Sequence, residues 1–442
     1  MHSKKKSTIQ TDITTVNGFS HDGRGIGDIK GKKIFLFNAL PNEVVKFKYK
    51  KQRSRFAEGD VFEVLENPSE IRVDPNCNHF IECGGCQIQH LNYSSQVQLK
   101  EKILLEILTS QGLKPNTLLP SLLGKPWNYR RKARLSVKYD EKRNKTLLGF
   151  RERSSHSVSA ISHCSILEAK IADKLEMMNE VINTLTIRSY IPQIELSITE
   201  KDSVIILRHL QPLTEDDKKK LITFCQYNDL TLFLQPNSIH NLELLYPKDK
   251  DLDFCYVLEN NIKLNFQPLQ FIQVNAVVNQ KMVNHALALL NLKKEDEVLD
   301  LFCGIGNFSL PIALKTKKVV GIELDSVAVS QAKENATSNK IFNTEFYCND
   351  LFSNLWQPNW NNKIYNKIVL DPPRSGAMEI CQAIQRWKPS VILYISCNPA
   401  TLARDSTILV DKGYQLDKLT MIDMFPQTKH IEAMALFTNE KN

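Results

Sequence analysis

The sequence contains no apolar run long enough to cross a membrane. A bilayer-spanning helix needs about 20 consecutive, mostly apolar residues, and the 442-residue chain contains no such run. The N-terminus, MHSKKKSTIQ, is basic, but the apolar core of a secretion signal does not follow it. We therefore expect a cytoplasmic protein that makes no membrane contact.

Internal repeats and low-complexity segments are also missing, which excludes solenoids, propellers and collagen-like chains. A disulfide framework is not expected either, because cytoplasmic thiols stay reduced. The ten cysteines should then serve as ligands, catalysts or packing residues. With 42% hydrophobic and 24% charged residues, the chain has globular composition. Its length favours two or three domains.

The net charge of +8 is unevenly distributed along the chain. Residues 121–153 contain 11 Lys or Arg against 3 Asp or Glu. Such an excess favours a polyanionic partner such as RNA. We expect contacts to the RNA backbone from four basic residues of this stretch, which are Arg130, Arg131, Lys132 and Arg134. The alternative is a solvated strand face.

Residues 1–66 are predicted to form a small β-barrel of the oligonucleotide-binding type. Short strands are separated by turns, and apolar and polar residues alternate in VVKFKYK and DVFEVLE. On such a barrel the basic segment KFKYKKQRSR can follow a phosphate backbone. The alternative is a solvated basic hairpin, and this segment alone favours neither.

Residues 67–265 are predicted to form an α+β central domain. Strand-like segments such as ARLSVKY, IELSIT, SVIILRHL and LTLFLQ accompany one helical stretch, ILEAKIADKLEMMNEVINTL. A separate helix is expected over residues 93–112, where apolar residues recur at helical spacing. This helix needs a surface to pack on, and the C-terminal domain is the candidate.

Residues 266–442 alternate between strands and helices, which predicts a doubly wound α/β sheet. The strand candidates are EVLDLF, KVVGIEL, TEFYCND, KIVLDPP, ILYISC and IEAMALF. Ligands of such sheets bind beyond the carboxyl ends of the strands. We therefore expect the reactive site in this domain.

A glycine-containing turn, DLFCGIGNFSLPIA, is typical of a nucleotide site. Gly304 and Gly306 permit close approach of a ligand to the backbone, and Glu323 ends the next strand, where it can accept hydrogen bonds from ribose hydroxyls. A dinucleotide and S-adenosylmethionine both fit. No third glycine completes the dinucleotide pattern, and the downstream motifs favour the methyl donor. The alternative is a packing turn followed by a solvated glutamate.

Two further strand ends carry reactive groups, Asp371 in DPPRSG and Cys397 in SCNPATLARD. Uracil C5 is a poor nucleophile, but addition of a thiolate at C6 turns the ring into an enolate whose C5 attacks a methyl sulfonium. Cys397 is therefore the candidate nucleophile. The alternative for this cysteine is a buried packing residue.

A base must then remove the C5 proton, and Glu432 in KHIEAMALF is the candidate. On a strand it shares one face with Met434 and Leu436. Desolvation there should raise its pKa toward the working pH. His430 is the second candidate for the base, and a glutamate paired with a basic residue is the alternative for Glu432.

The motifs FIQVN, DLFCGIGNFSLPIA, DPPRSG, YISCNPATLARD and HIEAMALF, in this order, resemble the RNA 5-methyluridine methyltransferase family. The resemblance implies a Rossmann-like class I methyltransferase domain over residues 266–442, a TRAM barrel over residues 1–66, and S-adenosylmethionine as methyl donor. It makes Cys397 the nucleophile and Glu432 the general base. It also implies six cofactor contacts, which are Gln273, Phe302, Asn307, Glu323, Asp350 and Asp371.

One of these positions departs from the family pattern. Asp350 stands where the similar proteins carry an asparagine. A carboxylate accepts a hydrogen bond from the adenine amino group but donates none. Asp350 is therefore expected to accept a hydrogen bond from the adenine but not to donate one.

Four cysteines form a predicted metal site. Cys77, Cys83 and Cys86 follow the pattern C-x5-C-x2-C, and the family resemblance makes Cys164 the fourth ligand. From spacing alone, zinc and an iron–sulfur cluster fit equally well. The resemblance implies a [4Fe-4S] cluster. We expect this cluster to brace the central domain and to shape the RNA surface, and a redox role is the alternative.

The resemblance also implies the substrate, a specific uridine of 23S ribosomal RNA, and we expect the enzyme to act as a monomer. A uridine at another ribosomal or transfer RNA site is the alternative. Two other functions compete. One is a methyltransferase of exocyclic amines, which needs no cysteine nucleophile, and the other is a ribosome-assembly factor that uses the barrel and the basic segment alone.

Overall fold

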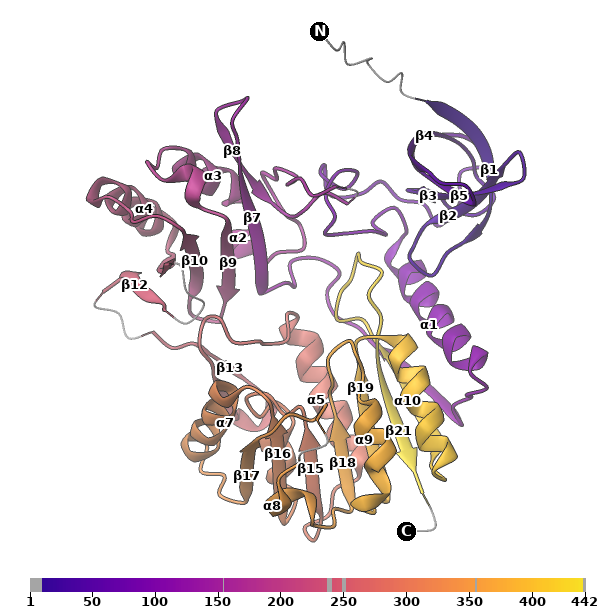
Figure 1. The fold of residues 1–442 in the computed structure, drawn as a ribbon, viewed down its shortest axis with the longest axis vertical. Helices are drawn as coiled ribbons and strands as arrows, with labels where there is room; N and C mark the ends of the chain where they lie inside the picture. The colour runs from indigo at the N-terminus through magenta and orange to yellow at the C-terminus, as the bar shows by residue number, and fades with distance from the viewer. Residues whose placement is uncertain (1–9, 154, 237–240, 249–251, 354–355, 440–442) are drawn as a thin grey trace.

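The computed structural model describes residues 10–153, 155–236, 241–248, 252–353 and 356–439. The ends of the predicted first and last domains, residues 1–9 and 440–442, lie outside the described residues. A barrel, a six-stranded sheet and an eight-stranded sheet form three separate bodies (Figure 1). No helix among the described residues has the length and apolar character that a membrane span requires.

The N-terminal body is a closed barrel with the strand order β1-β2-β3-β5-β4. β3 and β5 pair in parallel and the other neighbours are antiparallel. Phe47 is fully buried in its core, and a Cβ atom on Gly59 would lie 2.7 Å from the Phe47 ring. The predicted barrel is confirmed, with strands β1 (Thr11–Phe19), β2 (Gly25–Ile29), β3 (Lys32–Phe37), β4 (Val44–Gln52) and β5 (Phe56–Glu66).

The central body is a mixed sheet with the order β12-β11-β10-β9-β7-β8. Its strands are β7 (Lys132–Asp140), β8 (Lys145–Gly149), β9 (Gln193–Ile198), β10 (Ser203–His209), β11 (Thr231–Pro236) and β12 (Glu243–Tyr246). Its helices are α2 (Ala169–Ala172), α3 (Leu175–Asn183) and α4 (Glu215–Asn228). The sequence analysis missed α4, because its first turn is highly charged. A capping box between Thr214 and Asp217 starts this helix.

The C-terminal body is a doubly wound sheet with the order β17-β16-β15-β18-β19-β21-β20-β6. Its strands are β15 (Glu297–Leu301), β16 (Lys318–Glu323), β17 (Thr344–Cys348), β18 (Lys367–Leu370), β19 (Val391–Ser396), β20 (Gln415–Ile422) and β21 (Glu432–Thr438). The helices are α5 (Ala276–Leu290), α6 (Ser309–Ala313), α7 (Ser326–Ser338), α8 (Pro358–Asn361), α9 (Met378–Ala383) and α10 (Pro399–Asp411). A small pair, β13 (Cys255–Val257) and β14 (Lys263–Asn265), leads into this body. All six predicted strands are present. Strand β20 was not predicted from the sequence.

An early segment of the chain completes the C-terminal sheet. Helix α1 (Tyr93–Ser110) packs against α10 and β20, and strand β6 (Thr117–Leu122) pairs in parallel with β20. Figure 1 shows α1 beside the yellow C-terminal strands. The expected packing of this helix on the C-terminal domain is therefore present. Because β6 belongs to the same sheet, residues 93–122 lie with the C-terminal body although the predicted limits, 67–265, place them in the central domain.

Candidate active site

The carboxyl ends of neighbouring strands bring the predicted reacting groups together. Asp371 follows β18 and Cys397 follows β19. β19 and β21 pair antiparallel with Ser396 opposite Ala433. Cys397 directly follows Ser396 and Glu432 directly precedes Ala433, so both lie next to this pair, and the charge of Glu432 acts on the Cys397 thiol. The candidate nucleophile and the candidate base thus meet at one edge of the sheet.

Glu432 shares one strand face with apolar core residues, and the charges of Asp371, Lys100, Arg374 and Asp423 also act on it. Met434 and Leu436 on its face belong to one hydrophobic core, whereas Ala433 and Phe437 face the other. The Glu432 side chain is buried, and this burial, followed by the nearby Asp371 carboxylate, raises its pKa to about 8. Such a carboxyl group changes protonation near neutral pH, which suits a general base.

Cys397 is partly exposed at the end of β19. Burial, followed by the charges of Glu432 and Asp371, raises the pKa of its thiol to about 11. The Arg374 guanidinium acts in the opposite direction. His430, the second candidate for the base, has its pKa lowered to about 4 by burial and by Arg374. It is therefore a neutral imidazole at pH 7.

The glycine turn after β15 is fixed to the next strand. The backbone N–H of Gly304 donates to Glu323 Oε2 at 3.1 Å, and Glu323 Oε1 accepts from Leu324 N at 2.8 Å and Asp325 N at 3.1 Å. Gly306 adopts φ +98°, which glycine reaches without a steric cost. Phe302 adopts φ +68°, an uncommon conformation for a residue with a side chain. The Glu323 carboxylate is thus held by three backbone N–H groups, and its side chain is partly exposed.

Asn307 belongs to the glycine turn after β15, and Gln273 lies in the loop before α5. Asn307 forms a reciprocal pair of amide hydrogen bonds with Asn279, at 3.0 and 2.9 Å, and its Oδ1 accepts from Tyr256 Oη at 2.9 Å. The backbone carbonyl of Gln273 accepts from Arg131 Nε at 2.8 Å. The glycine turn and the Gln273 loop are thus held by residues from outside the sheet.

Asp350 follows β17, so five successive strand ends contribute to the same edge. Its Oδ1 accepts from Phe352 N at 2.9 Å, and the Phe352 ring packs against Phe302 with 5.7 Å between centroids. Desolvation, followed by the charges of Asp300 and Glu323, raises the pKa of Asp371 to about 7. The edge therefore concentrates carboxyl groups, which suits a cationic ligand.

The sequence analysis missed Asp300, a buried carboxyl group at the centre of this edge. Its Oδ2 accepts from the Ser309 hydroxyl, and its Oδ1 is buried and finds no hydrogen-bond partner among the described residues. Burial raises its pKa to about 7. An aspartate inside the apolar strand EVLDL was the available signal, because an isolated buried carboxylate is costly without a function or partner.

The four predicted metal ligands line one cavity. Cys77, Cys83 and Cys86 approach it from the loop after the barrel, and Cys164 approaches from the segment before α2. All four are free thiols, and the backbone N–H of Gly85 donates to Cys83 Sγ at 3.4 Å. Burial raises the pKa of each thiol. Yet no set of three or more such side chains is arranged for a single metal ion in the described part of the chain.

Two of the four basic residues expected to contact RNA are directed inward, which corrects that prediction. Arg131 is buried and stacks on the Tyr256 ring, 4.5 Å from its centroid. Lys132 donates to the carbonyls of Pro268, at 3.0 Å, and Gln270. Both residues hold the loop that leads to Gln273. The number of basic residues in a segment gives no information on the direction in which their side chains point.

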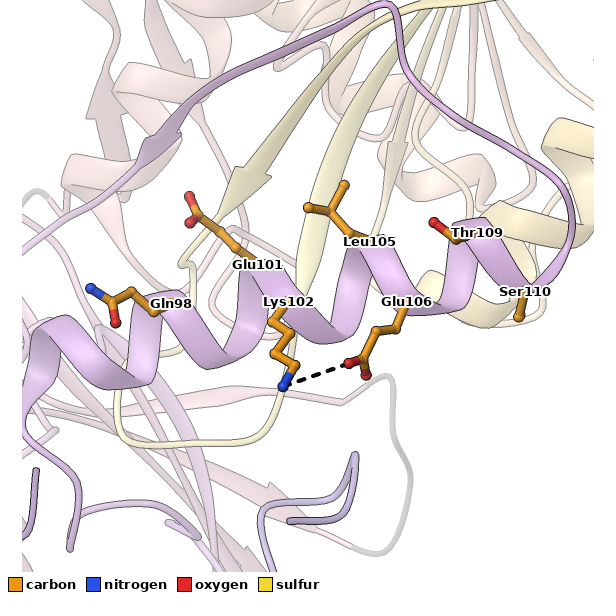
Figure 2. Close-up of a pocket in the computed structure, with 7 residues that line it drawn as sticks. All are labelled: Gln98, Glu101, Lys102, Leu105, Glu106, Thr109 and Ser110. Carbon is orange, nitrogen blue, oxygen red and sulfur yellow. Dashed lines mark ion pairs between the residues drawn. The ribbon is translucent and has the colours of Figure 1, made fainter. Parts of the chain in front are cut away.

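Arg134 remains on the surface. Its side chain is 68% exposed and pairs with Glu195 at 2.9 Å. A separate hollow follows the outer face of α1 (Figure 2) and is lined by Gln98, Glu101, Lys102, Leu105, Glu106, Thr109 and Ser110. It contains none of the predicted site residues. The candidate site is therefore defined by the strand ends and not by this hollow.

The chain is similar to known proteins over nearly its full length. The family model for tRNA (uracil-5-)-methyltransferases matches residues 92–440. The 23S rRNA (uracil(1939)-C(5))-methyltransferase RlmD of Legionella pneumophila (strain Lens) is 42% identical over 438 residues, covering 98% of each chain. The protein of the same name from Francisella tularensis subsp. novicida (strain U112) is 40% identical over 444 residues, covering 99% of this chain and 98% of the relative.

A solved structure shares the fold. The Pyrococcus abyssi tRNA (uracil-54, C5)-methyltransferase, determined in complex with S-adenosyl-L-homocysteine, aligns with a TM-score of 0.74 at 23% identity. The alignment covers 97% of this chain and 100% of the archaeal one. The family resemblance inferred from the motifs is confirmed, and the chain belongs to the tRNA (uracil-5-)-methyltransferase family.

Proposed function

We propose that the protein transfers a methyl group from S-adenosylmethionine to C5 of one uracil in 23S ribosomal RNA, at the position numbered 1939 in its relatives. The observation that carries the proposal is the juxtaposition of Cys397 and Glu432 at the end of β19 and the start of β21. The full-length similarity to 23S rRNA enzymes supports the substrate.

The methyl donor would be held at the strand ends. Its sulfonium and amino groups are cationic and match the carboxyl groups of Asp300 and Asp371, Glu323 would accept from the ribose hydroxyls, and the backbone of the Gly304 turn is open to close approach. Phe302, Asn307, Asp350 and Gln273 complete the proposed contacts. When bound, S-adenosylmethionine supplies an electrophilic methyl group. Its positive charge would also favour the thiolate form of Cys397.

In the proposed mechanism the chain's own residues add and remove protons. The Cys397 thiolate adds to C6 of the uracil, and C5 takes the methyl group. Glu432 then accepts the C5 proton, the electrons of the C5–H bond re-form the C5–C6 double bond, and the C6–S bond breaks to regenerate the thiolate. The pKa of about 8 makes Glu432 a base of suitable strength for this step.

RNA containing 5-fluorouridine tests the mechanism. Because fluorine cannot leave as a proton would, the wild-type enzyme should remain covalently bound to this RNA through Cys397. Cys397→Ala should form no adduct and no methylated product. Cys348→Ala removes the exposed thiol at the end of β17 and serves as the matched control. Methylation by Cys397→Ala would instead favour an amine methyltransferase.

The target nucleotide needs its own experiment. Mapping 5-methyluridine in ribosomal and transfer RNA from cells with and without the gene should show loss at one 23S position. Loss at a transfer RNA position would support the alternative substrate, which the name of the archaeal structural relative keeps open. Absence of any change would contradict the enzymatic proposal and favour an assembly factor.

We further propose that the cavity of Cys77, Cys83, Cys86 and Cys164 holds a [4Fe-4S] cluster. A zinc ion would draw four sulfurs to about 2.3 Å from one point, whereas a cluster binds each sulfur to a different iron atom. Four thiols around one cavity supply the four thiolates that a [4Fe-4S] cluster takes, and the metal content of the protein distinguishes the cluster from zinc. Anaerobically purified protein should absorb broadly near ~400 nm and contain iron. Stoichiometric zinc without iron would contradict the proposal.

Three expectations from the sequence remain proposals. They are a monomeric state, a cytoplasmic location, and backbone contacts to RNA from the barrel and from Arg130 and Arg134. Light scattering of the purified protein checks the first. For the last, Arg134→Ala should weaken RNA binding and reduce its salt dependence while leaving S-adenosylmethionine binding unchanged.

A further inference from the structure

The connection between β20 and β21 leads directly into the candidate base. We call residues 423–431 the strap. In Figure 1 it is the yellow loop that rises above the sheet toward the other two bodies. Glu432 is the first residue of β21 after the strap. The strap therefore leads directly into Glu432, whose backbone also pairs with Ile422 of β20.

Gln427 is at the centre of the strap. Its side chain is buried, and its backbone adopts φ +69°, a left-handed conformation that is uncommon for glutamine. Its Oε1 accepts from Gln96 Nε2 at 2.9 Å, and its backbone N–H donates to Gln96 Oε1 at 3.1 Å. Strained conformations of this kind persist where the surroundings fix them, and they concentrate at functional sites.

The loop that carries Cys77, Cys83 and Cys86, which we call the cysteine loop, contacts the strap from a second side. The backbone carbonyl of Gln427 accepts from Gln87 N at 3.0 Å and Ile88 N at 3.2 Å. Gln87 directly follows Cys86, and its Oε1 accepts from Lys429 N at 3.3 Å. Tyr129, which is also buried, donates from its hydroxyl to the carbonyl of Pro426 at 2.9 Å. The strap is thus attached to the chain beside the predicted cluster.

Helix α1 contacts the first residues of the strap. Lys100 Nζ donates to Asp423 Oδ1 at 2.7 Å and to the Phe425 carbonyl at 3.0 Å, and Tyr93 Oη donates to Asp423 Oδ2 at 2.9 Å. These residues lie on the inner face of α1. The outer face carries the hollow of Figure 2, where Lys102 pairs with Glu106 at 3.8 Å. Two residues on the inner face of α1, Tyr93 and Lys100, therefore bind the strap.

We propose that Gln427 is a positioning residue for Glu432, and that the strap transmits the arrangement of the cysteine loop and α1 to the proton-abstraction step. The inference rests on the proposed function, because it assigns the base to Glu432. Gln427 acts through the backbone of the strap and contacts neither substrate nor cofactor.

The proposal predicts which step fails when the strap loosens. Addition of Cys397 to C6 and methylation of C5 do not use the Glu432 carboxylate as a base. Transfer of the C5 proton to Glu432, with re-formation of the C5–C6 double bond and release of the thiolate from C6, does use it. A displaced carboxylate therefore leaves the methylated RNA bound covalently to Cys397.

The test uses the full-length protein with Gln427→Ala, which removes the Gln427 Oε1 contact to Gln96, and with Gln96→Ala, which removes that contact and also the acceptor of the Gln427 backbone N–H. Multiple turnover on ordinary RNA should fall by up to ~100-fold, the cost of a displacement of about 1 Å in a reacting group. A denaturation-resistant complex carrying the transferred methyl should accumulate. Deuterium at uracil C5 should slow both variants more than it slows wild type.

The control is Asn183→Ala in the central body, which removes hydrogen bonds to Thr146 N, at 2.7 Å, and Asn179 O, at 2.9 Å. It should leave turnover and the isotope effect unchanged. Adduct formation with 5-fluorouridine RNA should be as fast in Gln427→Ala as in wild type, since that adduct needs no base.

Three outcomes would overturn the positioning role. In the first, Gln427→Ala turns over normally. In the second, turnover and 5-fluorouridine adduct formation fall in parallel without accumulation of the methylated complex, which indicates general destabilisation. In the third, wild-type enzyme forms no 5-fluorouridine adduct, which contradicts the proposed function itself and removes the basis of the inference.

Discussion

At the scale of single residues, the pKa of Glu432 predicts how activity depends on pH. The carboxyl group must be ionised to accept the C5 proton, and its pKa is raised to about 8. Turnover should therefore rise as the pH increases from 6 and should level off above about 8 if proton abstraction limits the rate. A pH profile of single-turnover product release checks this. A profile that falls between pH 6 and 8 would contradict the assignment.

The same pKa shift predicts a cost to stability. The folded chain keeps a proton on Glu432 up to about pH 8, whereas the unfolded chain releases it near the ordinary value of 4.5. The free energy of unfolding should therefore decrease as the pH rises between these two values. Glu432→Gln stays neutral, so it should be more stable than wild type at pH 9, by an amount of order 1–4 kcal/mol, and equally stable at pH 4. Urea unfolding at both pH values measures the difference.

At the scale of elements, one buried ion pair joins α1 to the end of β20. Lys100 and Asp423 are 2.7 Å apart with side chains 2% and 0% exposed. Lys100→Met leaves the Asp423 carboxylate buried without its cation, so we expect a loss of about 3–5 kcal/mol in the free energy of unfolding. The double variant Lys100→Met with Asp423→Leu should recover most of this loss. Equal stability of the single variant and wild type would contradict the role of the pair.

Lys102→Met is the matched control for this prediction. It lies on the same helix, is 73% exposed, and pairs only with Glu106 at 3.8 Å. Exposed pairs of this type contribute about 0.5 kcal/mol or less. The control also separates loss of charge on α1 from loss of the buried contact.

At the scale of the whole molecule, Arg153 of the central body contacts the barrel and connects the two bodies. Its guanidinium stacks on Phe37, 3.4 Å from the ring centroid, pairs with Asp60 at 2.8 Å, and donates to the Ile81 carbonyl at 2.9 Å. Arg153→Ala should loosen the barrel without unfolding it, because the barrel has its own core. Limited proteolysis should then cut faster within residues 67–92.

S-adenosylmethionine binding should not change in Arg153→Ala, since the strand ends of the C-terminal sheet lie in another body. RNA binding should weaken, because the barrel and the central body would no longer be held as one surface. The control Arg143→Ala removes an arginine that is 74% exposed and pairs weakly with Asp140 at 3.7 Å. Equal proteolysis rates for Arg153→Ala and wild type would contradict the fastening role.

Several features were determined by the sequence itself. Period-2 alternation predicted the barrel strands and the two faces of β21, because a strand with one buried face must alternate. Strand–helix alternation predicted the doubly wound sheet, and its strand ends predicted that Asp371 and Cys397 lie near the Gly304 turn. The motifs assigned the family.

The tertiary structure decided the rest, because long-range pairing leaves no local signal. The packing of α1 on the C-terminal domain was expected, but nothing in residues 113–122 indicates that β6 pairs with β20 and so completes the C-terminal sheet. The inward direction of Arg131 and Lys132 depends on a loop more than 130 residues away. The attachment of Gln427 to Gln96 and to the cysteine loop likewise exists only in the folded chain, since each contact joins segments that the sequence separates.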